Sequence, residues 1–273
     1  MVTFIICVKH YKNCHSYETT WKLLENTLVS VCNQTDENFN VIVVSNKTLD
    51  DFSNHPKIKN VKFIEVDWDP PSSSDSWQIN KQVRFQVGAN QIRKDRGTKY
   101  ILALSQVQRV NNENHYVMFV DADDFIHKKL AEYVNNSDKD FLKIVKGYKL
   151  GKWNTFKFMH KFKFNDVCGT CNITKVELLK ERINLDNIKI NSAQCDVLQT
   201  TSDYYLKNII GAHPISFSYF EDKGYSGGVV PFFGAIYNCT HNEQHSGKGH
   251  RKLYKICTDA MIKDFSIKTF ENL

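Results

Sequence analysis

The stretch of the chain that decides its fold is Tyr116-Val117-Met118-Phe119-Val120-Asp121-Ala122-Asp123-Asp124. A short, very apolar run of this kind is typical of a buried β-strand. Here it runs straight into a cluster of carboxylates. Because residues i and i+2 of an extended backbone point the same way, we expect Asp121 and Asp123 to face one cleft at the carboxyl end of the strand.

The segments before this strand alternate apolar, β-branched runs with helical patterns. The order strand, helix, strand, strand, helix, strand is close to half of a nucleotide-binding sheet. It predicts an α/β fold with a mostly parallel, Rossmann-like sheet flanked by helices, whose ligands sit beyond the carboxyl ends of the strands. We expect strands at 2–8, 39–45, 61–66 and 116–120, and helices at 16–33 and 78–93.

The second half of the chain is less regular. A helical pattern resumes at 125–135, and lysines alternate with aromatic residues at 156–164, which suggests a strand. Thr174 and Glu177 have the spacing of a capping box, which predicts a helix start. Further expectations are a helix near Ser202 and Asp203, a strand within 224–237, a helix from Leu253 and a boundary near Gly151.

Composition sets outer limits on the class of protein. The chain has 273 residues, 41% of them hydrophobic and 24% charged, which fits a globular protein and excludes wholesale disorder. No apolar run approaches the roughly 20 residues of a membrane span. The start of the chain reads as a strand and not as a signal peptide, so we expect a cytoplasmic location and reduced cysteines. The net charge of +6 suits phosphate-bearing or acidic ligands, or else a solvated lysine-rich surface.

The acidic cluster has two interpretations. Bringing several carboxylates into a cleft is costly, and a divalent cation offsets that cost. Mn²⁺ or Mg²⁺ suits carboxylate, water and phosphate oxygens, so a metal shared with a phosphorylated ligand is expected at Asp121 and Asp123. The alternative is structural: acidic residues at the first turn of a following helix stabilise that helix.

Asp121-Ala122-Asp123-Asp124 after an apolar strand resembles the Asp-x-Asp motif of GT-A type glycosyltransferases, especially glycosyltransferase family 2. The resemblance implies transfer of a sugar from a nucleotide-diphosphate sugar to the hydroxyl of a glycan or other acceptor, with Mn²⁺ or Mg²⁺ as cofactor. It implies that residues 1–150 bind the donor. Residues 151–273 would form the acceptor-binding half of the same domain, with a C-terminal helical extension. Neither a nucleic acid partner nor a membrane span is expected.

The same resemblance implies contacts with the donor. Asp67 follows the third strand, where relatives contact the nucleobase; otherwise it is a turn residue. Lys81 and Arg84 lie on a helix that faces the donor in relatives; otherwise they form a solvated helix face. The residues assigned to the donor are therefore Asp67, Lys81, Arg84, Asp121 and Ala122.

The catalytic and metal-binding groups also follow from the resemblance. Asp203 is expected to be the general base of an inverting reaction, with an N-cap as its alternative role. Glu221 and Asp222 are the second choice, and a surface turn suits them equally. His241 and His245 are expected to bind the metal, together with Asp121 and Asp123, or to be exposed loop residues.

Two further segments, 168–171 and 45–47, are relevant to these assignments. Cys168-Gly169-Thr170-Cys171 lies where relatives have a small-residue loop beneath a sugar, and Gly169 would permit close backbone approach. Ser45-Asn46-Lys47 stands where the family has an acidic pair, which is a departure from its pattern.

Two other functions remain open from the sequence. A sugar-phosphate nucleotidyltransferase would carry a glycine-rich, basic signature after the first strand, and residues 8–13 contain no glycine. A catalytically inactive nucleotide- or glycan-binding protein would use the acidic cluster only as a helix cap.

Overall fold

The computed structural model describes residues 1–49, 52, 54–70, 81–107, 114–151, 155–159, 163–213, 216–241, 255–256 and 258–267. Side chains are described for these residues except 81–89, 155–159 and 255–256.

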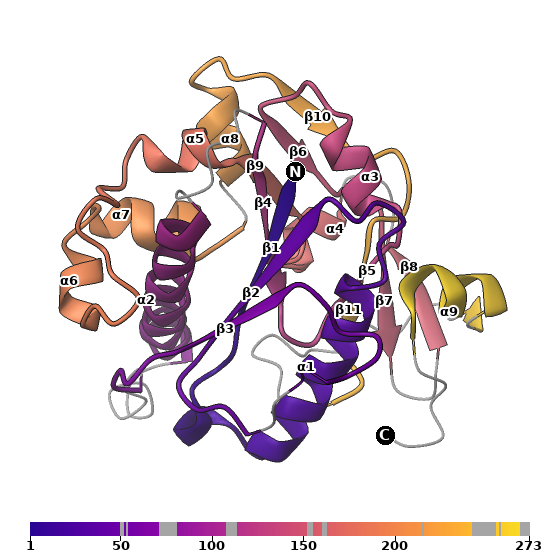
Figure 1. Ribbon diagram of the computed structural model, residues 1–273, viewed down its shortest axis with the longest axis horizontal. Coiled ribbons are helices and arrows are strands. Elements are labelled where there is room, and N and C mark those ends of the chain that lie inside the picture. Colours follow the sequence, from indigo (N-terminus) through magenta and orange to yellow (C-terminus); the bar gives the residue numbers. More distant parts are fainter. Residues whose placement is uncertain are drawn as a thin grey trace.

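The described strands form a central 7-stranded sheet in the order β10-β6-β9-β4-β1-β2-β3 (Figure 1). Neighbouring strands are parallel except where β9 pairs antiparallel with β4 and with β6. The fold is therefore mixed α/β with a mostly parallel central sheet, as predicted. The strands are β1 (Val2–Cys7), β2 (Phe39–Ser45), β3 (Val61–Glu65), β4 (Tyr116–Asp121), β6 (Phe141–Lys143), β9 (Asn172–Lys175) and β10 (Gly227–Val229).

The chain reverses direction across this sheet between β1 and β4. It passes from β1 to β2 and β3 on one side, and then returns to place β4 on the other side of β1. The register sets Cys7, at the end of β1, beside Asp121, at the end of β4. Ligands of open α/β sheets bind outside the carboxyl ends of the strands at such a switch point.

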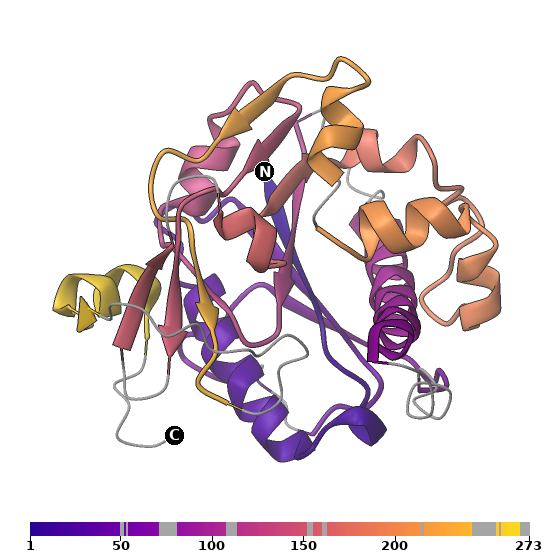
Figure 2. The ribbon, with the colours of Figure 1, turned by 180° about the vertical axis from the view of Figure 1, so that it is seen from behind.

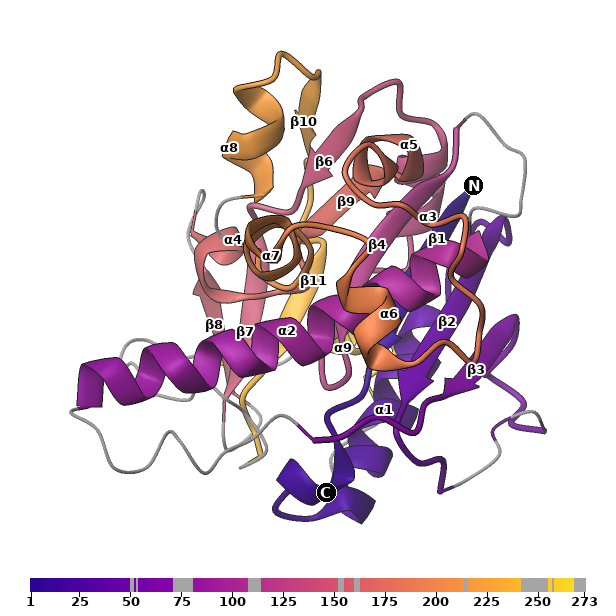
Figure 3. The same ribbon diagram turned by 90° about the vertical axis from the view of Figure 1, so that its left-hand side faces the viewer.

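Two helices flank the sheet on opposite faces (Figures 1 and 3). Helix α1 (Tyr17–Val31) begins after Ser16, whose side chain accepts a hydrogen bond from the Thr19 amide at 3.1 Å. It buries Trp21 and Leu24 in the core. Helix α2 (Lys81–Val107) contacts β1 and β2. Both crossovers are the long connections that parallel strands require.

Helix α2 runs well beyond the predicted end at residue 93. The polar residues 93–97 interrupt the apolar period, which is why the sequence suggested an end there. In the structure Lys99 is fully buried, and its Nζ donates to the Val8 carbonyl and to Asp95 Oδ2, each at 3.0 Å. The charge of Lys99 is therefore stabilised by a carbonyl just after β1 and by a carboxylate one turn back along α2, although the local sequence pattern favours an exposed lysine.

A second, 5-stranded sheet has the order β12-β8-β7-β11-β5 among the described strands (Figure 2). Strand β5 follows the acidic cluster and pairs antiparallel with β11, so the residues after β11 return to the end of β4. Helix α9 (Asp259–Phe265) packs on this sheet through Phe265. The strands are β5 (Phe125–Ile126), β7 (Gly147–Gly151), β8 (Thr155–Met159), β11 (Ala235–Asn238) and β12 (Lys255–Ile256).

Short helices complete the described fold. Two local predictions were wrong. The stretch 125–135 is strand β5 followed by a short helix and not one helix, and Thr174 lies in β9 and makes no helix cap. Pairing with β11 and with β4 places Phe125–Ile126 and Thr174 in strands, and the helix that the capping box predicted begins at Val176, after Lys175. The short helices are η1 (Tyr11–Asn13), α3 (Leu130–Asn135), α4 (Phe164–Val167), α5 (Val176–Lys180), α6 (Gln194–Leu198), α7 (Asp203–Tyr205), η3 (Leu206–Ile210) and α8 (Ser216–Glu221).

The main core includes residues from both halves of the chain, such as Ile5, Leu142 and Phe217. The cysteines that the structure describes are all free, as expected. No helix in the described part of the chain has both the length and the apolar character needed to cross a bilayer.

A buried histidine links β1 to the start of β4 and makes stability depend on pH. His115 Nε2 lies 2.8 Å from Thr3 Oγ1, and burial lowers the pKa of His115 from 6.5 to about 4. The folded state holds the neutral ring, whereas the unfolded chain takes up a proton below 6.5. The free energy of unfolding is therefore highest above that pH and falls as the pH drops towards 4.

We predict that His115→Gln removes this part of the pH dependence. The free energy of unfolding is measured with urea at about pH 7.5 and about pH 5. Between these values it should fall more for the wild type than for the variant, and the difference should be on the order of 1 kcal/mol per pH unit. Equal falls in the two proteins would contradict the prediction.

Candidate functional site

The site is built around the carboxylate of Asp121 at the switch point. Arg96 of α2 donates from Nη1 to Asp121 Oδ1 at 2.9 Å. The Asp121 amide donates to Thr170 Oγ1 at 3.0 Å. Gly169 packs so closely that a Cβ placed there would lie 2.5 Å from Asp121 Oδ2. The carboxylate is thus fixed from two directions, and the close approach of Gly169 predicted from the sequence is present.

Arg96 also binds the segment that follows η3. Its Nε and Nη2 donate to the Gly211 carbonyl at 3.2 and 2.8 Å. Gly211 in turn packs against the Arg93 carbonyl, which would collide with a Cβ at this position. One guanidinium therefore joins α2, the end of β4 and the turn after η3.

The second carboxylate of the motif meets a histidine from the other end of the chain. His241 Nε2 lies 3.0 Å from Asp123 Oδ2, and their side chains are 8% and 24% exposed. His241 comes shortly after β11, and the pairing of β11 with β5 brings it back to the acidic cluster. Two of the four residues that the sequence assigned to a metal are therefore in contact.

The third carboxylate, Asp124, is buried and serves the fold. Its Oδ2 accepts from Thr170 Oγ1 at 2.5 Å and from Cys168 Sγ at 3.2 Å, and its Oδ1 accepts from the Asn238 amide at 3.0 Å. Burial, and then the charges of Asp123 and Asp121, raise the pKa of Asp124 well above its usual range. Asp124 thus ties the end of β4 to the 168–171 loop and to β11.

On the β1 side of Asp121, the residues that directly follow β1 and β2 include two buried polar side chains, His10 and Asn46. Asn46, in the departing Ser45-Asn46-Lys47 stretch, donates from Nδ2 to the carbonyls of Val66 and Trp68 at 3.3 and 3.1 Å. His10, after β1, is buried and stacks on Tyr11 with ring centroids 4.5 Å apart. The side-chain amide of Asn46 thus holds the loop after β3, at the position where the resemblance predicted an acidic residue.

Among the other residues predicted to contact the donor, Asp67 and Ala122 have described side chains. Asp67 is exposed in the loop after β3, at the same edge of the sheet, and Ala122 lies half-buried in the turn after β4. Lys81 and Arg84 belong to α2, but their side chains lie outside the described residues, as does all of His245.

The structure does not bring Asp203 to the carboxylates. It begins α7 behind the N-cap Ser202, its side chain is 69% exposed, and it accepts from Lys207 Nζ at 2.7 Å. The carboxyl end of this helical segment, at Gly211, is the part that contacts Arg96. Asp203 therefore lies at the far end of the segment, and its role as a base stays a prediction.

Glu221 and Asp222 lie at the end of α8, where Glu221 Oε1 is 3.9 Å from Lys143 Nζ. Helix α8 starts at Ser216, which is hydrogen-bonded to Asn172 at the start of β9, the edge where Asp121 lies. After α8 the chain reaches Ser226, which pairs with Asp140 just before β6. Both acids are exposed, and the structure does not bring them to Asp121.

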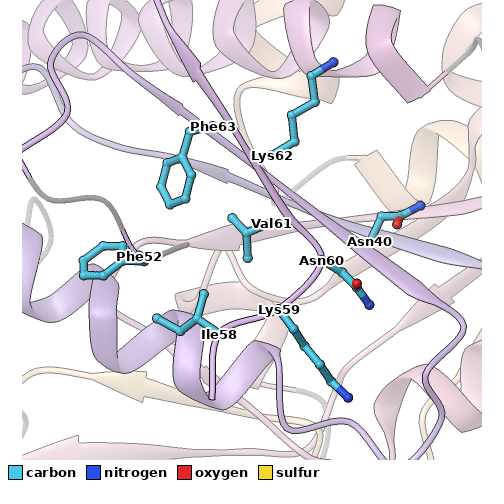
Figure 4. A pocket seen from close by; sticks show the side chains of 8 residues that line it. All are labelled: Asn40, Phe52, Ile58, Lys59, Asn60, Val61, Lys62 and Phe63. Atoms are coloured by element: carbon cyan, nitrogen blue, oxygen red, sulfur yellow. The ribbon is translucent and has the colours of Figure 1, made fainter. Parts of the chain in front are cut away.

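A pocket of about 420 Å³ lies elsewhere, near the amino ends of β2 and β3 (Figure 4). Its described lining contains lysines and apolar side chains but no carboxylate. The chemistry of the Asp121 site is absent from this lining, so we do not assign the function there. The lining residues are Asn40, Phe52, Ile58, Lys59, Asn60, Val61, Lys62 and Phe63.

Sequence reasoning missed Arg96 and the structural role of Asp124. Arg96 lies 25 residues before Asp121 in a charged stretch with no local signature. Asp124 looks like its acidic neighbours in the sequence, and only burial separates it from them. Among the described residues, no three His, Cys, Asp or Glu side chains form a complete metal site.

No family model matches the sequence, and no curated protein matches it. Similar solved structures include the galactosyltransferase LgtC in complex with donor and acceptor sugar analogues, at 9% identity, TM-score 0.36 and 87% coverage of each chain. The cytidylyltransferase IspD of Francisella tularensis aligns at 13% identity and TM-score 0.37, over 90% of this chain and 94% of that one.

The glycosyltransferase GlyE of Streptococcus pneumoniae aligns at 10% identity and TM-score 0.36, over 84% of this chain but 45% of GlyE. The function proposed below rests on the residues at the end of β4.

Removal of the Asp124 carboxylate should destabilise the fold. Asp124→Ala leaves the Thr170 hydroxyl and the Asn238 amide buried without an acceptor, which should lower the free energy of unfolding by about 3 kcal/mol. Asp124→Asn keeps an acceptor oxygen and should cost less. Chemical denaturation of both variants tests this, and equal losses would contradict the assigned contacts.

Gly169→Ala should displace the Asp121 carboxylate and weaken its contact with Arg96. We expect a loss of about 1–3 kcal/mol in the free energy of unfolding, as for other overpacked sites. In a double-mutant cycle with Arg96→Met the two losses should not add, because both changes act on one carboxylate. Additive losses would show that Gly169 does not support the ion pair.

Proposed function

We propose that this protein is a GT-A type glycosyltransferase that moves a sugar from a nucleotide-diphosphate sugar to an acceptor hydroxyl, assisted by Mn²⁺ or Mg²⁺. The observation that carries the proposal is the contact between Asp123 and His241 at the switch-point edge of the sheet, beside the Asp121 carboxylate that Arg96 fixes. A half-buried carboxylate and a buried imidazole at the carboxyl ends of parallel strands suit a metal–diphosphate complex.

The metal-binding groups in this proposal are Asp123 and His241. Their approach to 3.0 Å places one oxygen and one nitrogen ligand together, and Mg²⁺ or Mn²⁺ commonly takes few protein ligands and completes its shell with phosphates and water. Asp121 was also predicted to bind metal, but its Oδ1 is engaged by Arg96 and its Oδ2 packs on Gly169. We therefore assign Asp121 to positioning and not to direct ligation. A bound cation would stabilise the negative charge of the leaving diphosphate.

The remaining groups act on the donor by position and charge. Arg96 offsets the charge of Asp121, so that a diphosphate can approach an acidic strand end. Asp124 points away from the donor side, since its two oxygens are buried and accept hydrogen bonds from Thr170, Cys168 and Asn238. The nucleoside would lie on the β1 side of Asp121, beyond the carboxyl ends of β1 and β2. The general base and the stereochemical course stay predictions from the resemblance.

Metal-dependent binding tests the proposal. Wild-type protein should bind UDP or GDP in Mn²⁺ and lose most of that affinity in EDTA. Asp123→Ala should weaken binding in Mn²⁺ at least about tenfold, or about 1.4 kcal/mol, by calorimetry. Asp186→Ala removes an exposed carboxylate outside the site and serves as the matched control, with unchanged affinity expected.

The reaction products separate this proposal from its alternatives. A panel of nucleotide sugars in Mn²⁺ should yield free nucleoside diphosphate. Pyrophosphate released from a nucleoside triphosphate and a sugar phosphate would instead support a nucleotidyltransferase. Equal nucleotide binding by the wild type and Asp123→Ala would contradict the metal site.

A further inference from the structure

The chain turns sharply between the end of β11 and His241, and one side chain holds that turn. Strand β11 ends at Asn238, which is only 1% exposed. Its Oδ1 accepts two hydrogen bonds from Thr240, one from the backbone amide at 3.1 Å and one from the hydroxyl at 2.7 Å. An asparagine that accepts from the amide two residues on holds its own backbone in a turn. The Asn238 side chain therefore fixes the backbone of the residue just before His241.

The same turn is seated on the acidic cluster. The Asn238 amide donates to Asp124 Oδ1 at 3.0 Å, and the amide of the following residue donates to β7 at 2.8 Å. At the other end of the turn, His241 Nε2 lies 3.0 Å from Asp123 Oδ2. Because Asp123 and Asp124 are neighbours in the chain, the two ends of the turn meet two adjacent acids. These contacts close a ring between the end of β4 and the residues after β11.

The link through Thr240 decides where the imidazole of His241 lies. The amide and the hydroxyl of Thr240 are both held by one oxygen of Asn238. Without that acceptor, rotations about the backbone of residues 239 and 240 would carry the ring away from Asp123. A metal ion requires its ligands within a few tenths of an ångström of their ideal positions. Groups behind the ligands that fix their orientation therefore contribute to metal affinity.

We propose that Asn238 is a positioning residue for the metal site, and that its side-chain oxygen, by holding Thr240, aims the His241 imidazole at the cation. The inference rests on the proposed function and deepens it, because it names a group behind one ligand that determines metal affinity. An amide oxygen has two lone pairs, and Thr240 occupies both. Asn238 therefore acts through His241 and is not itself a ligand.

The test measures metal affinity and stability separately. MnCl₂ is titrated into each protein, alone and with UDP or GDP, and free Mn²⁺ is followed by electron paramagnetic resonance. Asn238→Ala should weaken Mn²⁺ binding by about 10- to 100-fold, the range typical of groups that orient a metal ligand. Asn238→Ser keeps a weaker acceptor for the amide two residues on, so it should recover part of the loss.

A double-mutant cycle separates positioning from a general effect on the fold. In a protein that already carries His241→Ala, Asn238→Ala should cause no further loss of Mn²⁺ affinity, because the ring that it positions is absent. Thr3→Val is the matched control. It removes a buried hydroxyl that contacts His115 near the amino end of β1, so it should lower stability and leave Mn²⁺ affinity unchanged.

A milder variant keeps the test decisive if Asn238→Ala does not fold. Thr240→Val removes one of the two hydrogen bonds of the turn and should weaken Mn²⁺ binding about threefold, again only when His241 is present.

The inference is overturned if the folded Asn238 and Thr240 variants bind Mn²⁺ as tightly as the wild type. It is also overturned if they weaken binding equally with and without the imidazole of His241, since the turn would then serve the fold alone. Weak binding by Asp123→Ala and His241→Ala would in those cases still support the proposed function. Failure of the wild type to bind Mn²⁺, with or without a nucleotide, would instead overturn the proposed function and the inference with it.

Discussion

The ion pair between Arg96 and Asp121 is the interaction on which the rest of the site depends. It joins α2, which crosses one face of the sheet, to the end of β4 at the switch point. The same guanidinium holds the Gly211 carbonyl, so the turn after η3 takes its position from it. A planar guanidinium with several fixed donors can serve two acceptors at once, which a lysine ammonium on a flexible stem does less well.

Three acidic residues lie at or just after the end of β4, and the fold accommodates each differently. Asp121 pairs with an arginine, Asp123 contacts a histidine, and Asp124 is buried among hydrogen-bond donors. The repulsion that a local pattern implies is thus reduced before any ligand binds. A charge remains at Asp123, at the place where a cation and a diphosphate are proposed to meet.

The anchored segments share one physical feature, which is close backbone approach. Gly169 and Gly211 both stand where a Cβ would collide with a group of the site or with α2. Their contacts, together with the buried Asp124, make the site a rigid part of the core. Preorganised groups of this kind lose little freedom when a ligand binds, which suits a site that must orient two substrates.

The sequence by itself determined the strands of the parallel half-sheet, because uniformly apolar, β-branched runs such as 41–44 are dictated by burial on both faces. It also located the acidic strand end and, through the resemblance, the distant histidine His241. Tertiary structure alone decided the length of α2, the burial of Asp124 and the contact of Arg96 with Asp121. Those features depend on residues that are far apart in the chain and are brought together by strand pairing and burial. The local periodicity of the sequence does not indicate which distant residues will be in contact.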